Sequence, residues 1–158
     1  MPRAPKTIKG SKKVREYFKW ILRLFSADAF GASLRGLGVN ILLSNVPRCV
    51  DFLTQVFEMK AHQASADFAI MAYQSQVFQL HSDATYSAHP RLPLLPENPP
   101  RGVGVELRLY DSDPDTAAAR AEALGAMILQ APSDKPHGLR ECSILGPDGY
   151  LWVPSRPL

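Results

Sequence analysis

The sequence lacks several features that would place it in a specialised class of protein. It has only two cysteines in 158 residues, Cys49 and Cys142, and neither lies in a C-x-x-C pair. A disulfide framework is therefore excluded, and we expect two buried thiols in a reducing compartment. No apolar run reaches the ~18 residues needed to cross a bilayer, and no secretory signal with a small-residue cleavage site is visible. A nucleophile elbow and a glycine-rich phosphate loop are also missing. We expect a cytoplasmic protein, at most peripheral to a membrane.

Charge is distributed unevenly along the chain. Residues 1–35 contain nine Lys/Arg and two acidic residues, a net charge of +7, whereas residues 36–158 carry −4. The basic character therefore belongs to an N-terminal extension and not to the rest of the chain. Of all 158 residues, 46% are apolar, enough to form a sizeable core. This asymmetry indicates an attachment role for the extension, and no nucleic-acid partner is expected.

The extension, residues 1–35, is expected to be a basic arm followed by an amphipathic helix. Apolar residues recur at helical spacing over residues 14–25, beside a basic flank, and the helix should end before the small residues 26–33. Four interpretations remain open for this helix. It could lie on an anionic membrane surface, dock into the groove of a partner protein, direct the chain to an organelle, or pack on its own domain.

The rest of the chain, residues 36–154, repeats one order of elements. The patterns predict modules at about 36–82 and 102–154, each with the order β-α-β-β-β, joined by a proline-rich spacer over 83–101. Asn45 and Asp113 are predicted to begin the two helices, and Gly125 to end the second. The predicted strands cover residues 37–43, 68–73, 76–81, 103–110, 126–130, 140–145 and 150–154.

This order and its motifs resemble the vicinal oxygen chelate superfamily, which includes glyoxalase I, extradiol dioxygenases and bleomycin-resistance proteins. The matching stretches are Gly38–Asn45, Val50–Phe52, Val56–Met59, Val105–Tyr110 with Asp113, and Gly138–Cys142 through Gly146-Pro-Asp-Gly-Tyr-Leu-Trp152. The resemblance implies an α+β fold in which two βαβββ modules form a cupped mixed sheet, here with an added N-terminal helix.

The resemblance also indicates where a metal ion would be bound. In metal-binding members each module supplies one side chain from its first strand and one from its last, and these positions fall on Gly38, Gln79, Glu106 and Val153. Gly and Val have no donor atom and Gln is a weak neutral donor, so Glu106 alone is a good ligand. We therefore expect no metal cofactor. A register shift that brings His81 beside Gln79 and Glu106 would instead favour zinc, nickel or iron.

Two strands carry polar residues that could orient a ligand. Glu106 and Arg108 are two residues apart on one strand and point to the same side. The resemblance places that side in the cup, where the pair could bind an amide, carboxylate or hydroxyl group. On the outer side they would be a solvated surface. His81 is either a ligand-binding residue or a strand-end histidine that faces water.

The remaining candidates depend on which face they occupy. One of Arg140 and Glu141 must face inward, and alternation alone does not say which. Tyr73 and Trp152 could line a pocket or belong to the core. No catalytic residue is assigned. The ligand-binding candidates are Gln79, Glu106, Arg108, His81, Tyr73, Arg140 and Trp152.

The leading hypothesis is a metal-free protein that binds a small organic molecule in its cup, which a homodimer could complete, as in the drug-sequestering branch of the superfamily. A second hypothesis is an accessory subunit, tethered to a complex or membrane surface through residues 14–25. A third is a metal-dependent enzyme, either a lactoylglutathione lyase-like lyase or a dioxygenase.

Overall fold

The computed structural model describes residues 26–158, so the helix expected over residues 14–25 lies outside the described part of the chain. The chain divides into two units between Gly38 and Val39, and each is described by itself. In the first unit, helix α2 covers Ala27–Ser33 and begins at Ser26, whose Oγ accepts a hydrogen bond from the backbone N–H of Ala29 at 3.2 Å. This short helix was not predicted from the sequence; the cap at Ser26 begins it.

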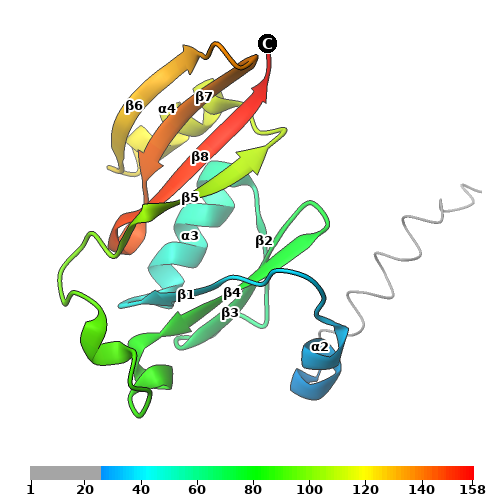
Figure 1. Cartoon of the computed structure of the whole chain (residues 1–158), viewed down its shortest axis with the longest axis vertical. Helices are drawn as coiled ribbons and strands as arrows, with labels where there is room; N and C mark the ends of the chain where they lie inside the picture. The colour runs from blue at the N-terminus through cyan, green and yellow to red at the C-terminus, as the bar shows by residue number, and fades with distance from the viewer. Residues whose placement is uncertain (1–25) are drawn as a thin grey trace, which may run out of the picture. The chain divides into compact units, whose positions relative to one another are not determined.

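The second unit begins with a βαβββ module (Figure 1). Its strands form one sheet in the order β1-β4-β3-β2, in which β1 and β4 are parallel and the other pairs are antiparallel. The three-residue strand β2 has no clear sequence pattern and was not located from the sequence. The elements are β1 (Asn40–Leu43), α3 (Val46–Phe57), β2 (Lys60–His62), β3 (Phe68–Tyr73) and β4 (Gln76–Ser82).

The spacer after β4 holds two short 3-10 helices, η1 (Asp83–Tyr86) and η2 (Leu92–Leu94). A second module follows with the same topology, in the strand order β5-β8-β7-β6. The predicted internal repeat and the α+β fold class are therefore confirmed. The elements of this module are β5 (Gly102–Tyr110), α4 (Pro114–Ala123), β6 (Met127–Asp134), β7 (Leu139–Leu145), η3 (Pro147–Gly149) and β8 (Tyr150–Pro157).

The helices begin where the sequence indicated. The side chain of Asn45 accepts a hydrogen bond from the N–H of Arg48 at 2.9 Å, and Asp113 accepts one from the N–H of Thr116 at 3.1 Å. A proline lies in the first turn of both helices, where its missing N–H costs nothing. The chain leaves α4 through Gly125, which has a φ of 73°.

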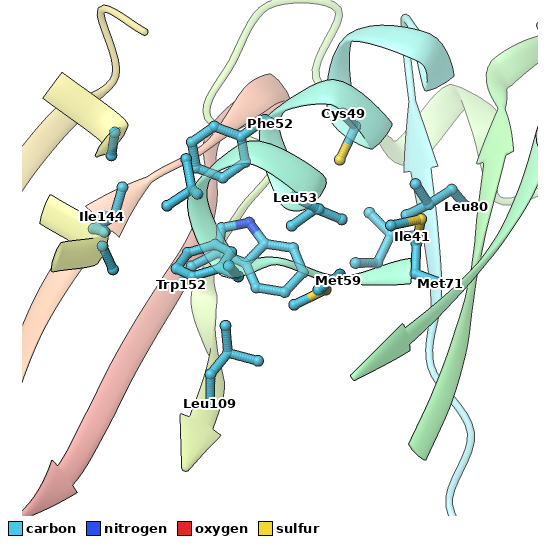
Figure 2. Close-up of a cluster of buried hydrophobic side chains, with 14 of the residues drawn as sticks. Ile41, Cys49, Phe52, Leu53, Met59, Met71, Leu80, Leu109, Ile144 and Trp152 are labelled. Atoms are coloured by element: carbon cyan, nitrogen blue, oxygen red, sulfur yellow. The ribbon is translucent and has the colours of Figure 1, made fainter. Parts of the chain in front are cut away.

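One hydrophobic core joins the two modules (Figure 2). Trp152 on β8 is 2% exposed, and its ring lies 5.8 Å from that of Phe57 on α3 and 5.9 Å from that of Phe78 on β4. Helices α3 and α4 also pack against each other, with an ion pair of 3.1 Å between Arg120 and Glu58. Each sheet therefore turns its helix-bearing face to the shared core. Its opposite face, which we call the open face, points away from that core.

The turn between β7 and β8 connects the modules. The carboxylate of Asp148 accepts hydrogen bonds from the backbone N–H of Ser44 at 2.9 Å and from its hydroxyl at 2.6 Å. The hydroxyl of Tyr150 donates to the carbonyl of Leu42 at 2.8 Å. Gly149 has a φ of 71°, and a Cβ there would lie 2.3 Å from the Cα of Pro100. Gly149 is thus required both by the backbone conformation of the turn and by the close approach of the spacer.

Both cysteines are buried, as expected: Cys49 lies in α3 and Cys142 in β7. Within residues 26–158, no helix is both long enough and apolar enough to cross a membrane.

Candidate functional site

The open face of the second sheet carries a group of charged side chains. Leu107 and Leu109 of β5 turn toward the core, so alternation places Glu106, Arg108 and Tyr110 on the open face. Arg108 is paired across the sheet with Val153 of β8. The sequence prediction that Glu106 and Arg108 share a side agrees with this geometry, and the side is the one without a helix.

Arg108 connects two carboxylates on this face. Its Nη1 donates to Oε2 of Glu106 at 2.8 Å, and its Nη2 donates a short hydrogen bond to Oε2 of Glu141 on β7. His137 lies with Nε2 at 3.4 Å from the same oxygen of Glu141. These four residues are called the Arg108 network below. Their exposure is graded, since the side chain of Glu141 is 11% exposed, that of Arg108 25% and that of Glu106 51%.

The length of the arginine side chain explains this network. β8 lies between β5, which carries Arg108, and β7, which carries Glu141. Because neighbouring strands are about 4.8 Å apart, these two residues are separated by two strand spacings. The Arg108 side chain has to cross β8 to reach Glu141. Two residues of β8 on this helix-free face, Val153 and Ser155, are accordingly almost fully buried.

Electrostatic interactions hold Arg108 and Glu141 in their charged forms. Burial lowers the pKa of Arg108, but the hydrogen bonds to Glu106 and Glu141 outweigh it and raise the pKa above the ordinary value. Burial raises the pKa of Glu141, yet the hydrogen bond and charge of Arg108, followed by those of His137, bring it below the ordinary value. The two carboxylates of Glu106 and Glu141 and the guanidinium of Arg108 together carry a net charge of −1.

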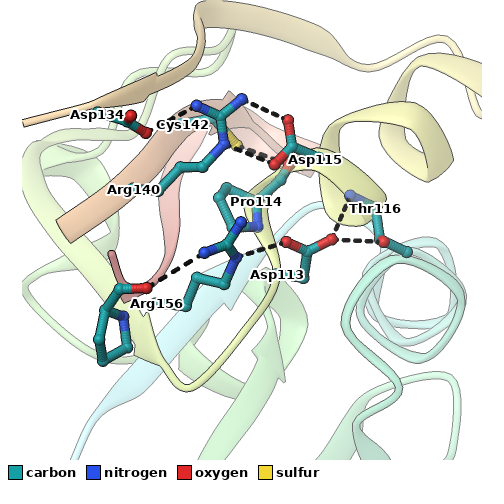
Figure 3. Close-up of polar contacts among 9 residues, drawn as sticks. Asp113, Pro114, Asp115, Thr116, Asp134, Arg140, Cys142 and Arg156 are labelled. Carbon is teal, nitrogen blue, oxygen red and sulfur yellow. Dashed lines mark hydrogen bonds and ion pairs between the residues drawn. The ribbon is translucent and has the colours of Figure 1, made fainter.

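Arg140, a sequence candidate for ligand binding, lies on the opposite face (Figure 3). Its guanidinium donates to Asp115 at the start of α4, at 2.7 Å, and to Asp134 of β6 at 2.8 Å. Because successive residues of a strand alternate, Glu141 takes the open face. The alternation rule limited the choice to these two residues, and only the position of α4 decides between them.

The two aromatic candidates do not line an open face. Trp152 belongs to the core. Tyr73 packs against the edge of the core, and its hydroxyl donates to the backbone carbonyl of Tyr110 at 2.5 Å. Both residues hold the modules together.

Gln79 and His81 lie on the open face of the first sheet, where they pair with Asn40 and Leu42. The ring of His81 is 5.0 Å from that of Phe68 and 5.3 Å from that of Tyr86. Burial, followed by the positive charge of Arg91, lowers the pKa of His81. The imidazole is therefore neutral at pH 7, and its buried Nε2 makes no hydrogen bond within the described part of the chain.

The structure also relocates one position that the resemblance implied. β1 begins at Asn40, so the first-strand residue beside Gln79 is Asn40 and not Gly38. Across from Glu106 lies Leu151, which has no donor atom, as is true of Val153.

These residues do not fit a divalent transition metal ion. Glu106 is the only carboxylate among the implied ligands, and Arg108 already binds it. Within residues 26–158, no group of three or more His, Cys, Asp or Glu side chains could hold such an ion. Gln79 and His81 are also not brought to the Arg108 network, since the two open faces both point away from the common core.

Comparisons with known proteins identify the fold. No protein-family model matches the chain, and no curated protein sequence matches it. Solved structures do match. A glyoxalase/bleomycin resistance protein/dioxygenase family enzyme from Burkholderia phytofirmans PsJN superposes with a TM-score of 0.64 at 18% identity, over 76% of this chain and 96% of that one. A glyoxalase/bleomycin resistance protein/dioxygenase from Nocardioides gives a TM-score of 0.60 at 21% identity, over 92% and 93%.

The fosfomycin resistance protein FosX from Mesorhizobium loti is also similar, with a TM-score of 0.57 at 14% identity over 79% of this chain and 94% of that one. The chain is thus a paired-βαβββ protein, built from two modules of one topology. Its fold is that of the vicinal oxygen chelate superfamily, which confirms the resemblance seen in the sequence at the level of the fold.

Proposed function

We propose that the chain binds a small organic molecule on the open face of its second sheet and uses no resident metal ion to do so. One observation carries the proposal: this face combines uncovered apolar side chains with the Arg108 network. Leu145 and Leu151 are half-buried there, and Met127 is 60% exposed. Small-molecule sites commonly have such an apolar surface with a few fixed polar groups.

A second copy of the chain is proposed to cover the bound molecule. Within one chain the open faces point away from the core, so neither closes over the other. Two large side chains remain exposed on the open face, Tyr110 of β5 and Met127 of β6, and Val103, Val105 and Leu129 are exposed elsewhere on the same sheet. Exposed apolar groups gathered on one face of a sheet are typical of a surface that another protein covers. A homodimer formed over the open face would bury Tyr110 and Met127 and enclose the ligand.

Titration of the full-length protein with a neutral aromatic probe, 2-naphthylmethanol, tests the binding proposal. We expect NMR shifts confined to β5, β7 and β8, and weaker binding by the variant Leu151→Ser on the open face. Leu124→Ser is the matched control, because Leu124 is an exposed leucine at the end of α4. Shifts scattered over the molecule, or equal affinity in both variants, would contradict the proposal.

Two further measurements test the proposed homodimer and the proposed absence of a resident metal ion. Light scattering on the eluting protein should show a dimer, and a monomer at all concentrations would refute the role of the second copy. Elemental analysis of the purified protein should find less than stoichiometric metal. Zinc, nickel or iron at one ion per chain would favour the lyase or dioxygenase hypothesis instead.

An attachment role for residues 1–35 is a second proposal, supported by the +7 charge of that segment and by the division of the chain at Gly38. The full chain should sediment with vesicles that contain phosphatidylserine, and a chain lacking residues 1–35 should stay in the supernatant. If neither form sediments, the full chain should still co-purify with a protein partner from its host cells, and the chain lacking residues 1–35 should not. Equal behaviour in both assays would refute attachment.

A further inference from the structure

Resting on the proposed binding function, we propose that the open face of the second sheet selects a ligand with a positively charged, hydrogen-bond-donating head group attached to a flat apolar body. The head group would bind at Glu106 and Glu141. The apolar body would lie along the leucines of β7 and β8.

The first argument is the charge balance of the Arg108 network. The positive charge of Arg108 is already shared by two carboxylates, so Glu106, Glu141 and Arg108 together present a net charge of −1 to a ligand. An anionic ligand at the remaining N–H groups of Arg108 would lie beside both carboxylates, which repel it. A cation meets no such repulsion.

The second argument is the placement of free acceptor atoms. Both hydrogen bonds from Arg108 end on Oε2 atoms, and the contact with His137 ends on the same oxygen of Glu141. The Oε1 atoms of Glu106 and Glu141 accept no hydrogen bond from any residue of the described chain. A carboxylate oxygen can accept more than one hydrogen bond, and a charged donor such as an ammonium group makes the stronger ones.

The third argument is the row of side chains that leads away from Glu106. Strand register pairs Glu106 with Leu151, Leu151 with Leu145, and Leu145 with Met127, so these four residues form a straight line across the sheet. At about 4.8 Å between strands, the three apolar residues cover roughly 10 Å beyond the carboxylate. That length suits a bicyclic aromatic body with its charged group at one end.

Tyr110 adds an aromatic surface on the same face. Tyr110 is 56% exposed, and its ring centroid lies 5.8 Å from the guanidinium carbon of Arg108. Aromatic faces attract cations, so an exposed tyrosine on this face also favours a positively charged ligand.

Three probes that share one ring system and differ in charge test this inference. They are 2-naphthylmethylammonium, 2-naphthylmethanol and 2-naphthoate, each titrated into the full-length protein at pH 7 and moderate salt and followed by NMR. We expect the cation to bind about fivefold more tightly than the alcohol, a gain of the size that one half-exposed carboxylate provides, and the anion to bind most weakly.

Two variants with equal changes of charge identify the source of the preference. Glu106→Gln should bring the affinity for the cation close to that for the alcohol, whereas Glu122→Gln, on the exposed surface of α4, should leave the preference unchanged. An unchanged preference in E106Q would overturn the inference. So would tighter binding of naphthoate than of the cation, and the proposed function would survive either result. If none of the three probes binds, the proposed function fails and this inference fails with it.

Discussion

Replacing Arg108 by methionine should destabilise the fold through its effect on Glu141. The Glu141 side chain is 11% exposed and Arg108 is its strongest partner. Methionine has a similar length and can still cover β8, so the packing over Val153 is largely kept. What changes is that a nearly buried carboxylate loses its counter-charge and a hydrogen-bond donor.

The expected loss is about 2 kcal/mol. Removing one partner of a fully buried ion pair costs roughly 3–5 kcal/mol, whereas an exposed pair contributes up to about 1 kcal/mol. Arg108 is 25% exposed and His137 remains 3.4 Å from Glu141, so the loss should lie between these limits. A domain stability of about 5–15 kcal/mol makes such a loss easy to measure.

The effect should also depend on pH. In the native protein the pKa of Glu141 lies below its ordinary value of 4.5, so its contribution to stability is present above pH 4.5 and is lost as the pH falls through the folded pKa. Without Arg108, burial remains as the largest influence and raises the pKa of Glu141 above that of the unfolded chain. The cost of the substitution is then greatest at pH 7 and shrinks as the carboxylate becomes protonated.

Urea unfolding followed by far-ultraviolet circular dichroism, at pH 7.5 and pH 4.5, measures both effects. The double variant R108M/E141L should recover most of the stability, because it removes the buried charge along with its partner. Arg120→Met is the control, since its ion pair with Glu58 is exposed and should contribute no more than about 1 kcal/mol. A loss under about 0.5 kcal/mol in R108M, or an equal loss at both pH values, would refute the reasoning.

Three further predictions concern the rest of the fold. Trp152→Ala should cost about 3–5 kcal/mol in urea unfolding, because it leaves a large cavity in the core. Trp152→Phe should cost much less, because phenylalanine keeps an aromatic ring in that space while removing a buried N–H that lacks a hydrogen bond; equal losses in the two variants would contradict this. Asp113→Ala should cost about 1.5 kcal/mol at neutral pH, since Asp113 caps α4 and pairs with Arg156 at 3.0 Å. That difference should fade as the pH falls from 3.8 toward the folded pKa of about 2, and a constant difference down to pH 2.5 would count against it. Burial raises the pKa of both Cys49 and Cys142 to about 12, so iodoacetamide at pH 8 should label them only after unfolding, and mass spectrometry would reveal any native labelling.

Local sequence signals were sufficient for the order of the elements apart from the short strand β2. The caps at Asn45 and Asp113, the stop at Gly125 and the Pro-Asp-Gly turn act within a few residues of their own positions, so they can be identified without knowing the tertiary structure. The repeat of βαβββ follows from them, and it led directly to the fold. The shared side of Glu106 and Arg108 was equally predictable, because it depends only on the two-residue period of a strand.

Tertiary packing decided everything that depends on which face of a strand is covered. The alternation of the strand does not say which of Arg140 and Glu141 faces the helix. The position of α4 decides that Arg140 lies on the helix side, so that Glu141 lies on the open face and pairs with Arg108. The sequence pattern does not distinguish whether Trp152 lines a pocket or belongs to the core. It is a core residue because the two modules pack their helix sides together. Contacts between residues distant in the chain have no local signal, and the Arg108 network is made of such contacts.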